Sequence, residues 1–285
     1  MQAHLWRIGI FAALMTCLAV SCLAVPPERI VSLNLCADQI LIDLVAPTRI
    51  AALSHLAADS KVSAITDRAR DLPLTRGEAE VVLSYDPDLV IAGTYSTPAT
   101  IALLERVGRR IVKVPLAADV GSIPDLIRRI AAAVEEPARG EALIAEFERR
   151  LQAADSGTTS ARPSALVYQV NGLASSATSL ADSVLRAAGF DNLAARKSLG
   201  PGGQIALEAL LTDPPDLLVL TGPIDEYRTA VAANLRHPAL AELRRQRNSL
   251  VLPWRHWLCG TQHVATAVEH LAAERRRLAR GTIGR

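Results

Sequence analysis

Two segments of the chain repeat one pattern, and this repeat constrains the fold more than any other feature. The first segment is 80–93 (EVVLSYDPDLVIAG) and the second is 208–222 (EALLTDPPDLLVLTG). In each, a glutamate lies seven residues before a Pro-Asp pair, and the pair opens an apolar run that closes on glycine. Any helix-to-strand connection can use Pro-Asp, but the shared spacing at similar places in the two halves indicates two related lobes.

The rest of the chain alternates short apolar runs with helical patterns, as βαβ units do. The apolar runs are rich in β-branched residues and bounded by breakers, which is typical of buried parallel strands. The predicted strands are 29–34, 50–54, 89–93, 110–115, 165–170, 217–221 and 250–253. The predicted helices are 38–45, 78–84, 99–107, 180–188, 206–212 and 263–279. The expected fold class is therefore α/β with mostly parallel sheets.

Segment 122–156 interrupts this alternation with helical patterns and little strand character. Proline is favoured in the first turn of a helix, so we predict a helix from Pro137 to Ala154, about 27 Å long. The expected domains are an N-terminal α/β lobe at 25–121, this connecting helical segment, and a C-terminal α/β lobe at 157–285.

Residues 1–24 have the pattern of a secretory signal peptide. Arg7 provides a basic start, and the apolar run that follows it ends in small residues. Two processing routes stay open: ordinary cleavage near the end of this segment, or a lipoprotein-type site at which Cys22 would be acylated. Both routes place the mature protein in the periplasm, free or lipid-anchored through Cys22.

The charge balance and one missing motif exclude two function classes. Lys and Arg number 31 against 29 Asp and Glu, so the chain lacks the basic surface expected of a nucleic-acid-binding protein. It contains no Gly-x-x-x-x-Gly-Lys-Ser/Thr loop, so it does not bind and hydrolyse ATP by that route.

The motifs that follow one another along the chain are RIVSLNLCADQILIDL, RIAALSHLA, EVVLSYDPDLVIAG, SLADSVLRAAGFDNLA, ALEALLTDPPDLLVL and LVLPWRHWLCGTQHVATAVEHLA. In their order and spacing they resemble the periplasmic binding proteins of iron-siderophore and cobalamin ABC importers. The resemblance implies two Rossmann-like lobes joined by a single long backbone helix, with a ligand captured between them. It also implies delivery to a membrane permease that is driven by a cytoplasmic ATPase. We expect a monomer that is not an enzyme and has no intrinsic cofactor, with cobalamin or a related metal chelate (siderophore, haem) as its transported ligand.

That family uses one glutamate per lobe to meet arginines of the permease, and Glu80 and Glu208 match those positions. Each opens a helix that precedes a strand, and such a helix begins at the edge where parallel strands end, so both carboxylates should lie near the ligand-binding rim. The alternative is that each glutamate only complements its helix dipole. Glu78 competes with Glu80 in the first lobe.

Ligands of open α/β sheets bind beyond the carboxyl ends of the strands, so the candidate contacts are the residues that follow the predicted strands. These are Cys36, His55, Tyr95, Tyr168, Gln169, Asn171, Trp254, His256 and Trp257. Aromatic rings with a few amides suit a large, flat, partly apolar ligand. An anionic siderophore would need several arginines and only Arg255 is placed there, which favours cobalamin. Both mature tryptophans are among the candidates, so tryptophan fluorescence should respond to the ligand.

Cys36 and Cys259 both follow predicted strands, one in each lobe. A disulfide between them would tie the lobes together and restrict their closure, and it requires Cα atoms within about 7 Å. Buried free thiols and direct metal ligation remain alternatives.

Two other function classes compete with ligand capture. One is a metal-dependent extracytoplasmic enzyme that uses Cys36, His55, His256 and Cys259, but no triad or metal motif supplies its base and nucleophile. The other is a bare transition-metal receptor, which would bring three or four His, Asp or Glu ligands to the cleft. Only His55 and His256 can be placed there, and they are also candidates for axial ligands of a chelated metal.

Overall fold

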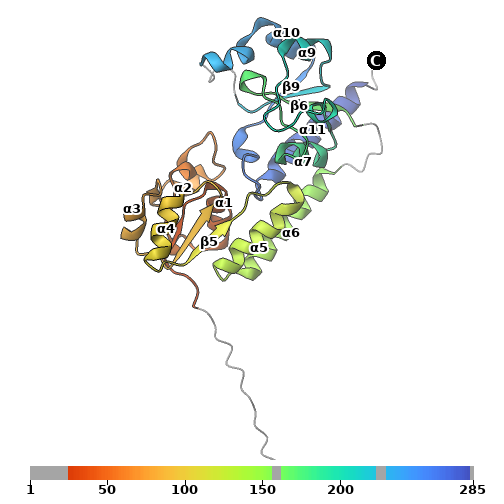
Figure 1. Ribbon diagram of the computed structural model, residues 1–285. Helices are drawn as coiled ribbons and strands as arrows, with labels where there is room; N and C mark the ends of the chain where they lie inside the picture. The colour runs from red at the N-terminus through yellow and green to blue at the C-terminus, as the bar shows by residue number, and fades with distance from the viewer. Residues whose placement is uncertain (1–24, 156–161, 223–228, 283–285) are drawn as a thin grey trace, which may run out of the picture.

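The computed structural model describes residues 25–155, 162–222 and 229–282. The expected signal peptide and the alternative lipidation site at Cys22 lie outside these residues. Figure 1 shows two lobes, the red-to-yellow first part of the chain and the green-to-blue last part, with a pair of helices along one side.

The first lobe is built on a five-stranded parallel sheet in the order β3-β2-β1-β4-β5. Its strands are β1 Ile30–Ser32, β2 Ile50–Ser54, β3 Leu74–Thr75, β4 Leu89–Gly93 and β5 Ile111–Val114. Its helices are α1 Leu35–Leu44, α2 Thr66–Ala69, α3 Ala79–Ser84 and α4 Pro98–Arg106. The central strands β1 and β4 are almost wholly buried, as their unbroken apolar runs predict.

The second lobe has a four-stranded parallel sheet in the order β7-β6-β8-β9. Its strands are β6 Ser164–Val167, β7 Asp191–Asn192, β8 Leu217–Leu220 and β9 Asn248–Val251. Its helices are α7 Leu180–Ala187, α8 Leu193–Arg196, α9 Leu207–Thr212, α10 Pro238–Gln246 and α11 Val264–Thr282.

The repeated sequence segment occupies equivalent places in the two sheets. It forms α3 and then β4 in the first lobe, and α9 and then β8 in the second. Strand β4 pairs with β1, the first strand of its lobe, and β8 pairs with β6, the first strand of the other. The two lobes are therefore related in topology as well as in sequence.

Two helices, α5 Ile123–Ala133 and α6 Pro137–Ala154, connect the lobes. Helix α6 begins at the proline that the sequence singles out and is 18 residues long. It packs against α5 and against α11, and in Figure 1 it runs from beside the first lobe toward the second. The long helical connection therefore takes the form of a helix pair, in which α6 makes the crossing.

One apolar core cluster extends through both lobes. It includes Ile30 and Leu89 from the first sheet, Ile144 and Phe147 from α6, and Val219 from the second sheet. Because α6 buries side chains against both lobes, packing as well as the chain connection holds them together. The expected α/β fold, with two lobes of parallel strands, is confirmed.

Candidate functional site

The carboxyl edge of the first sheet carries His55 and Tyr95. A short 3₁₀ helix, His55–Ala58, follows β2 directly, and the Ser54 hydroxyl caps it by accepting the Leu56 N–H at 3.2 Å. Tyr95 follows β4 and is 82% exposed. The imidazole of His55 is partly exposed, so both rings are available at this edge of the lobe.

A buried carboxylate fixes the chain just before His55. Asp38 accepts the Ser54 N–H through Oδ2 at 3.2 Å. Its complete burial raises its pKa well above the usual value, although hydrogen bonds from Ser32 and from the Ser54 amide oppose the shift. The end of β2 is thereby anchored to α1 inside the first lobe.

The carboxyl edge of the second sheet carries Trp254 and His256. Both lie in a 3₁₀ helix, Trp254–His256, that follows β9. The Trp254 N–H donates to the Thr221 carbonyl at 3.0 Å, which ties this turn to the end of β8. The partly exposed Trp254 ring meets Trp257 edge to face, with ring centroids 6.1 Å apart.

His256 is held in its neutral form. Burial lowers its pKa to about 4, and the positive charge of Arg255 and the rings of His270 and His263 add to the shift. The His270 ring centroid lies 6.3 Å away. A neutral imidazole accepts hydrogen bonds and binds transition metals, so His256 retains both capacities at neutral pH.

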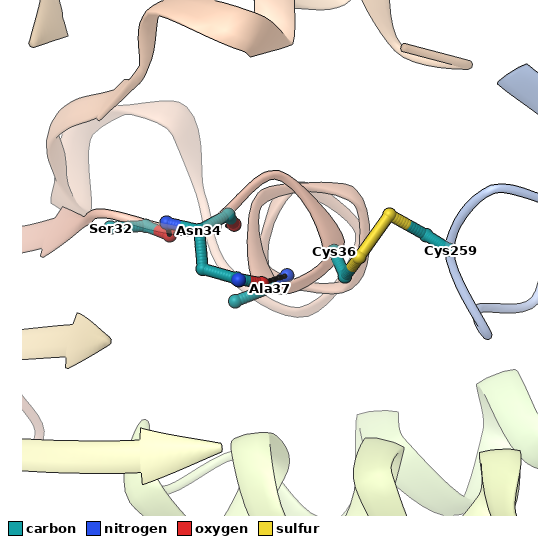
Figure 2. Close-up of a disulfide and its surroundings, with 5 residues drawn as sticks. All are labelled: Ser32, Asn34, Cys36, Ala37 and Cys259. Carbon is teal, nitrogen blue, oxygen red and sulfur yellow. Dashed lines mark hydrogen bonds between the residues drawn. A yellow bond between two sulfur atoms is a disulfide. The ribbon is translucent and has the colours of Figure 1, made fainter. Parts of the chain in front are cut away.

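A disulfide between Cys36 and Cys259 joins the two lobes. Figure 2 shows Cys36 on the first turn of α1, where Asn34 caps the helix by accepting the Ala37 N–H at 2.9 Å. The two Cα atoms are 5.2 Å apart. Because both sulfurs are bonded to each other, Cys36 offers no thiolate to a ligand, and metal ligation by the two cysteines is incompatible with this arrangement.

Polar contacts also cross between the lobes. The Arg255 guanidinium donates to the Ser60 carbonyl at 3.4 Å, which brings the segment after β9 to the segment after β2. The Gln262 side-chain amide donates to the Gln39 carbonyl at 2.7 Å and to the Asp43 carboxylate at 2.6 Å. The Arg255–Ser60 contact and the disulfide therefore hold the carboxyl edges of the two sheets next to each other, and Gln262 joins the lobes farther along α1.

Two of the aromatic candidates lie in the core instead of at the cleft. Tyr168 is 1% exposed and packs in a cluster with Leu166 and Leu218, and Trp257 is 2% exposed in the larger core. This corrects the expectation that both rings contact the ligand, because a side chain with almost no accessible surface cannot form a platform. Their place after a strand did not reveal that the chain turns each ring inward.

Gln169 and Asn171 lie in a turn after β6 that Asn234 supports. The Asn171 N–H donates to the Asn234 side-chain oxygen at 2.9 Å, and the Asn234 amide donates to the Gln169 carbonyl at 2.9 Å. Asn171 has a left-handed backbone, φ 56°, which asparagine tolerates better than most residues. Asn171 is exposed and Gln169 is partly exposed, so both remain at this edge.

Glu80 and Glu208 are each the second residue of a short helix, α3 and α9. Both are exposed, and among the described residues neither forms an ion pair with Lys or Arg. Glu78 is the residue before α3, and its side chain does not cap the helix. The two matched glutamates thus present unneutralised carboxylates from equivalent helices of the two lobes.

The sequence reasoning missed a set of exposed apolar side chains near the same edges. These are Leu56, Val231 and Leu258. Leu56 follows His55 and Leu258 follows Trp257, so inspection of the neighbours of the candidates would have found them. Val231 lies in the 3₁₀ helix Ala230–Arg236 and carried no motif. All three are exposed apolar side chains that lie close in sequence to, or after, the ends of strands.

Two kinds of structure are absent from the described parts of the chain. No three or more His, Cys, Asp or Glu side chains are grouped so that they could hold a metal ion. In those same ranges, no helix combines the length and the apolar character needed to cross a membrane.

The sequence pattern of the periplasmic binding protein family matches residues 30–251. The chain belongs to the periplasmic binding protein family. As a periplasmic binding protein it is one of a group of binding proteins rather than enzymes, and the two carboxyl edges described above are where such a fold offers a cleft.

Known proteins similar to this periplasmic binding protein carry names that refer to tetrapyrrole-type chelates. The cobalamin-binding protein of Halobacterium salinarum is 25% identical over 217 residues, which are 75% of this chain; the chain spans 58% of that relative. The apo structure of the periplasmic heme-binding protein RhuT from Roseiflexus sp. RS-1 is 25% identical, with a TM-score of 0.73 over 88% of this chain and 99% of that one. The vitamin B12-binding protein BtuF of Vibrio cholerae is 20% identical, with a TM-score of 0.67 over 89% and 98%, and shows the shared fold.

Proposed function

We propose that this periplasmic binding protein captures cobalamin or a related metal chelate such as haem between its lobes and delivers it to an ABC permease driven by a cytoplasmic ATPase. The observation that carries the proposal is the family match over residues 30–251, together with relatives named for cobalamin and haem. The mixture of aromatic, amide and apolar groups at the two sheet edges supports the same class of ligand.

The ligand contacts we propose come from both lobes. From the first lobe they are His55 and Tyr95, and from the second they are Gln169, Asn171, Trp254 and His256. The exposed apolar side chains of Leu56, Val231 and Leu258 would cover the faces of a flat macrocycle. Neutral His256 is a candidate for an axial metal ligand, because a pKa of about 4 keeps its nitrogen unprotonated.

For delivery, the exposed carboxylates of Glu80 and Glu208 are proposed to meet basic residues of the permease. The expected monomer needs no second copy for this contact, since each lobe supplies one carboxylate. We place the mature protein in the periplasm, with lobes at 25–121 and 157–285, and we propose that it catalyses no reaction. Acylation of Cys22 remains the alternative to a free periplasmic form.

A titration tests the proposal. Purified protein without its first 24 residues is titrated with cyanocobalamin, haemin, a ferric siderophore and zinc chloride, followed by absorbance and calorimetry. Saturable binding of one chelate without chemical change is expected. Zinc retention with conversion of a substrate would support a metalloenzyme, zinc binding alone would support a metal receptor, and binding of no chelate would refute the ligand class.

A further inference from the structure

A cavity of about 520 Å³ lies where the first lobe, the connecting helix and the second lobe meet. Its walls include Asp43 of α1, Arg68 of α2, and Gln262 and His263 just before α11. Helix α6 supplies the rest: Arg139, Ala142, Leu143, Glu146, Phe147 and Arg150. No part of the proposed chelate site contributes to it.

The cavity lies at the opposite end of α1 from the disulfide. Cys36 is on the first turn of α1, near the carboxyl edge of the sheet, whereas Asp43 is on the last turn. Seven residues separate them, which is about 10 Å along the helix axis. The cavity is therefore separate from the region between the carboxyl edges of the two sheets, where the chelate contacts are proposed.

Both carboxylates in the wall are already hydrogen-bonded to neighbouring side chains. Both oxygens of Asp43 are engaged, Oδ1 by the Arg68 guanidinium and Oδ2 by the Gln262 amide. Both oxygens of Glu146 accept from Arg149, at 2.7 and 2.8 Å. Each acid is thus already paired with an arginine, Asp43 with Arg68 and Glu146 with Arg149.

One arginine of the wall, Arg139, has several N–H groups without a hydrogen-bond partner among the described residues. Arg139 donates one N–H to the Leu44 carbonyl at 2.9 Å. Its nearest carboxylate is Glu136 at 3.8 Å, and Glu136 is already bonded to Arg49 at 2.6 Å. Since a guanidinium carries five N–H donors, most of those on Arg139 remain for a ligand.

Two further groups of the wall point to a polar occupant. Gln262 is 6% exposed, and its Oε1 atom has no hydrogen-bond partner within the described residues. Burial lowers the pKa of His263, so its ring is neutral at neutral pH and has one N–H to donate. The wall therefore holds three arginines against two carboxylates, and among its described side chains Gln262 Oε1 is the one buried acceptor without a partner.

We propose that this cavity, the junction site, binds a small molecule through a phosphate or carboxylate group, with Arg139 as its principal contact and Arg68 and His263 beside it. Paired oxygens of such a group match the fork of N–H donors on a guanidinium. The bound group would touch elements of both lobes and of α6, and so would favour the arrangement of the lobes seen here.

The test is calorimetric titration with inorganic phosphate and, separately, with succinate, against chloride at matched ionic strength. Saturable binding of either anion is expected, and the arm that binds identifies the group recognised. Arg139→Gln should weaken binding roughly tenfold or more, because a charge-assisted hydrogen bond is lost. Ala142→Trp, at an exposed position of α6, should abolish binding by filling the cavity.

Matched controls make the result specific. Arg128→Gln removes an exposed, ion-paired arginine outside the wall, and Ala145→Trp places the same bulk elsewhere on α6; both should bind like the parent. Chelate affinity and the melting temperature should be unchanged in all four variants. Failure of both anions to saturate, or equal binding losses in variants and controls, would overturn the proposal without bearing on chelate capture.

Discussion

Glu80 and Glu208 occupy the same position, the second residue of α3 and of α9, so each lobe presents one exposed carboxylate from an equivalent short helix. The equivalence follows from the sequence repeat, because β4 and β8, the strands that these helices precede, also occupy equivalent places in their sheets. Interaction with the helix dipole would by itself explain a glutamate in the first turn of either helix. It does not explain why both lobes present an exposed carboxylate without an ion-pair partner at the same position.

Charge reversal at both positions, Glu80→Lys with Glu208→Lys, should abolish transport while leaving chelate affinity unchanged. Uptake of labelled chelate by cells and calorimetry on the purified variant measure the two effects. Glu148→Lys, an exposed acid on α6, is the control and should transport normally. Normal uptake by the double variant would refute the docking assignment, and a loss in Glu78→Lys alone would transfer the first-lobe role to Glu78.

The two mature tryptophans should respond differently to substitution. Trp257→Ala removes a buried indole and should lower the free energy of unfolding by about 3–5 kcal/mol. Trp254→Ala changes a partly exposed ring at the sheet edge and should instead weaken chelate binding. Denaturant melts and chelate titrations of both variants separate the effects, and the reverse pattern would place the ligand against Trp257.

The free energy of unfolding should decrease at acidic pH, partly because of the protonation of His256. Its pKa is about 4 in the folded protein against 6.5 for the unperturbed group, so between these values the unfolded chain binds the proton first. The free energy of unfolding should therefore decrease as the pH falls from 6.5 to about 4, and this part of the decrease should be absent in His256→Gln. Melting temperatures across that range measure it. His237→Asn, which replaces an exposed histidine and keeps a capping side chain, should melt with the parent's pH dependence.

Removal of the disulfide should destabilise the protein without unfolding it. Cys36→Ser with Cys259→Ser frees a loop of 223 residues in the unfolded chain, and a loss on the order of 2–5 kcal/mol is expected. Urea melts measure the loss. Alkylation of the denatured protein without its first 24 residues, which retains only Cys36 and Cys259, should add no mass without reductant and two adducts with it; two adducts without reductant would show that the thiols are free.

The strands with the strongest sequence signal were predicted well, and those with the weakest were missed. Residues 50–54 and 89–93 were predicted as β2 and β4 and have those bounds, because their apolar runs end at clear breakers. Strands β3 and β7 have two residues each at sheet edges, so pairing defines them and periodicity does not. Strand β9 begins at Asn248, two residues before the prediction, since polar residues of an edge strand still pair with β8.

The sequence predicted which residues lie at the sheet edges, but it predicted less well which of their side chains are exposed there. The sequence places residues after strands, and the structure does bring His55, Tyr95, Trp254 and His256 to the sheet edges. It could not show which rings turn inward, because that depends on the local path of the chain. Tyr168, for example, enters an antiparallel bridge with Ala174 that carries its ring into the core.

The bond between Cys36 and Cys259 gives the chain the connectivity of a ring. Their separation of 223 residues leaves only 25–35 and 260–282 of the described structure, the second including helix α11, outside the closed loop. A protease that cuts the backbone once anywhere inside the loop therefore releases no fragment, and both lobes remain attached to each other. In an oxidising compartment exposed to proteases, such a protein can survive a single cut in one piece.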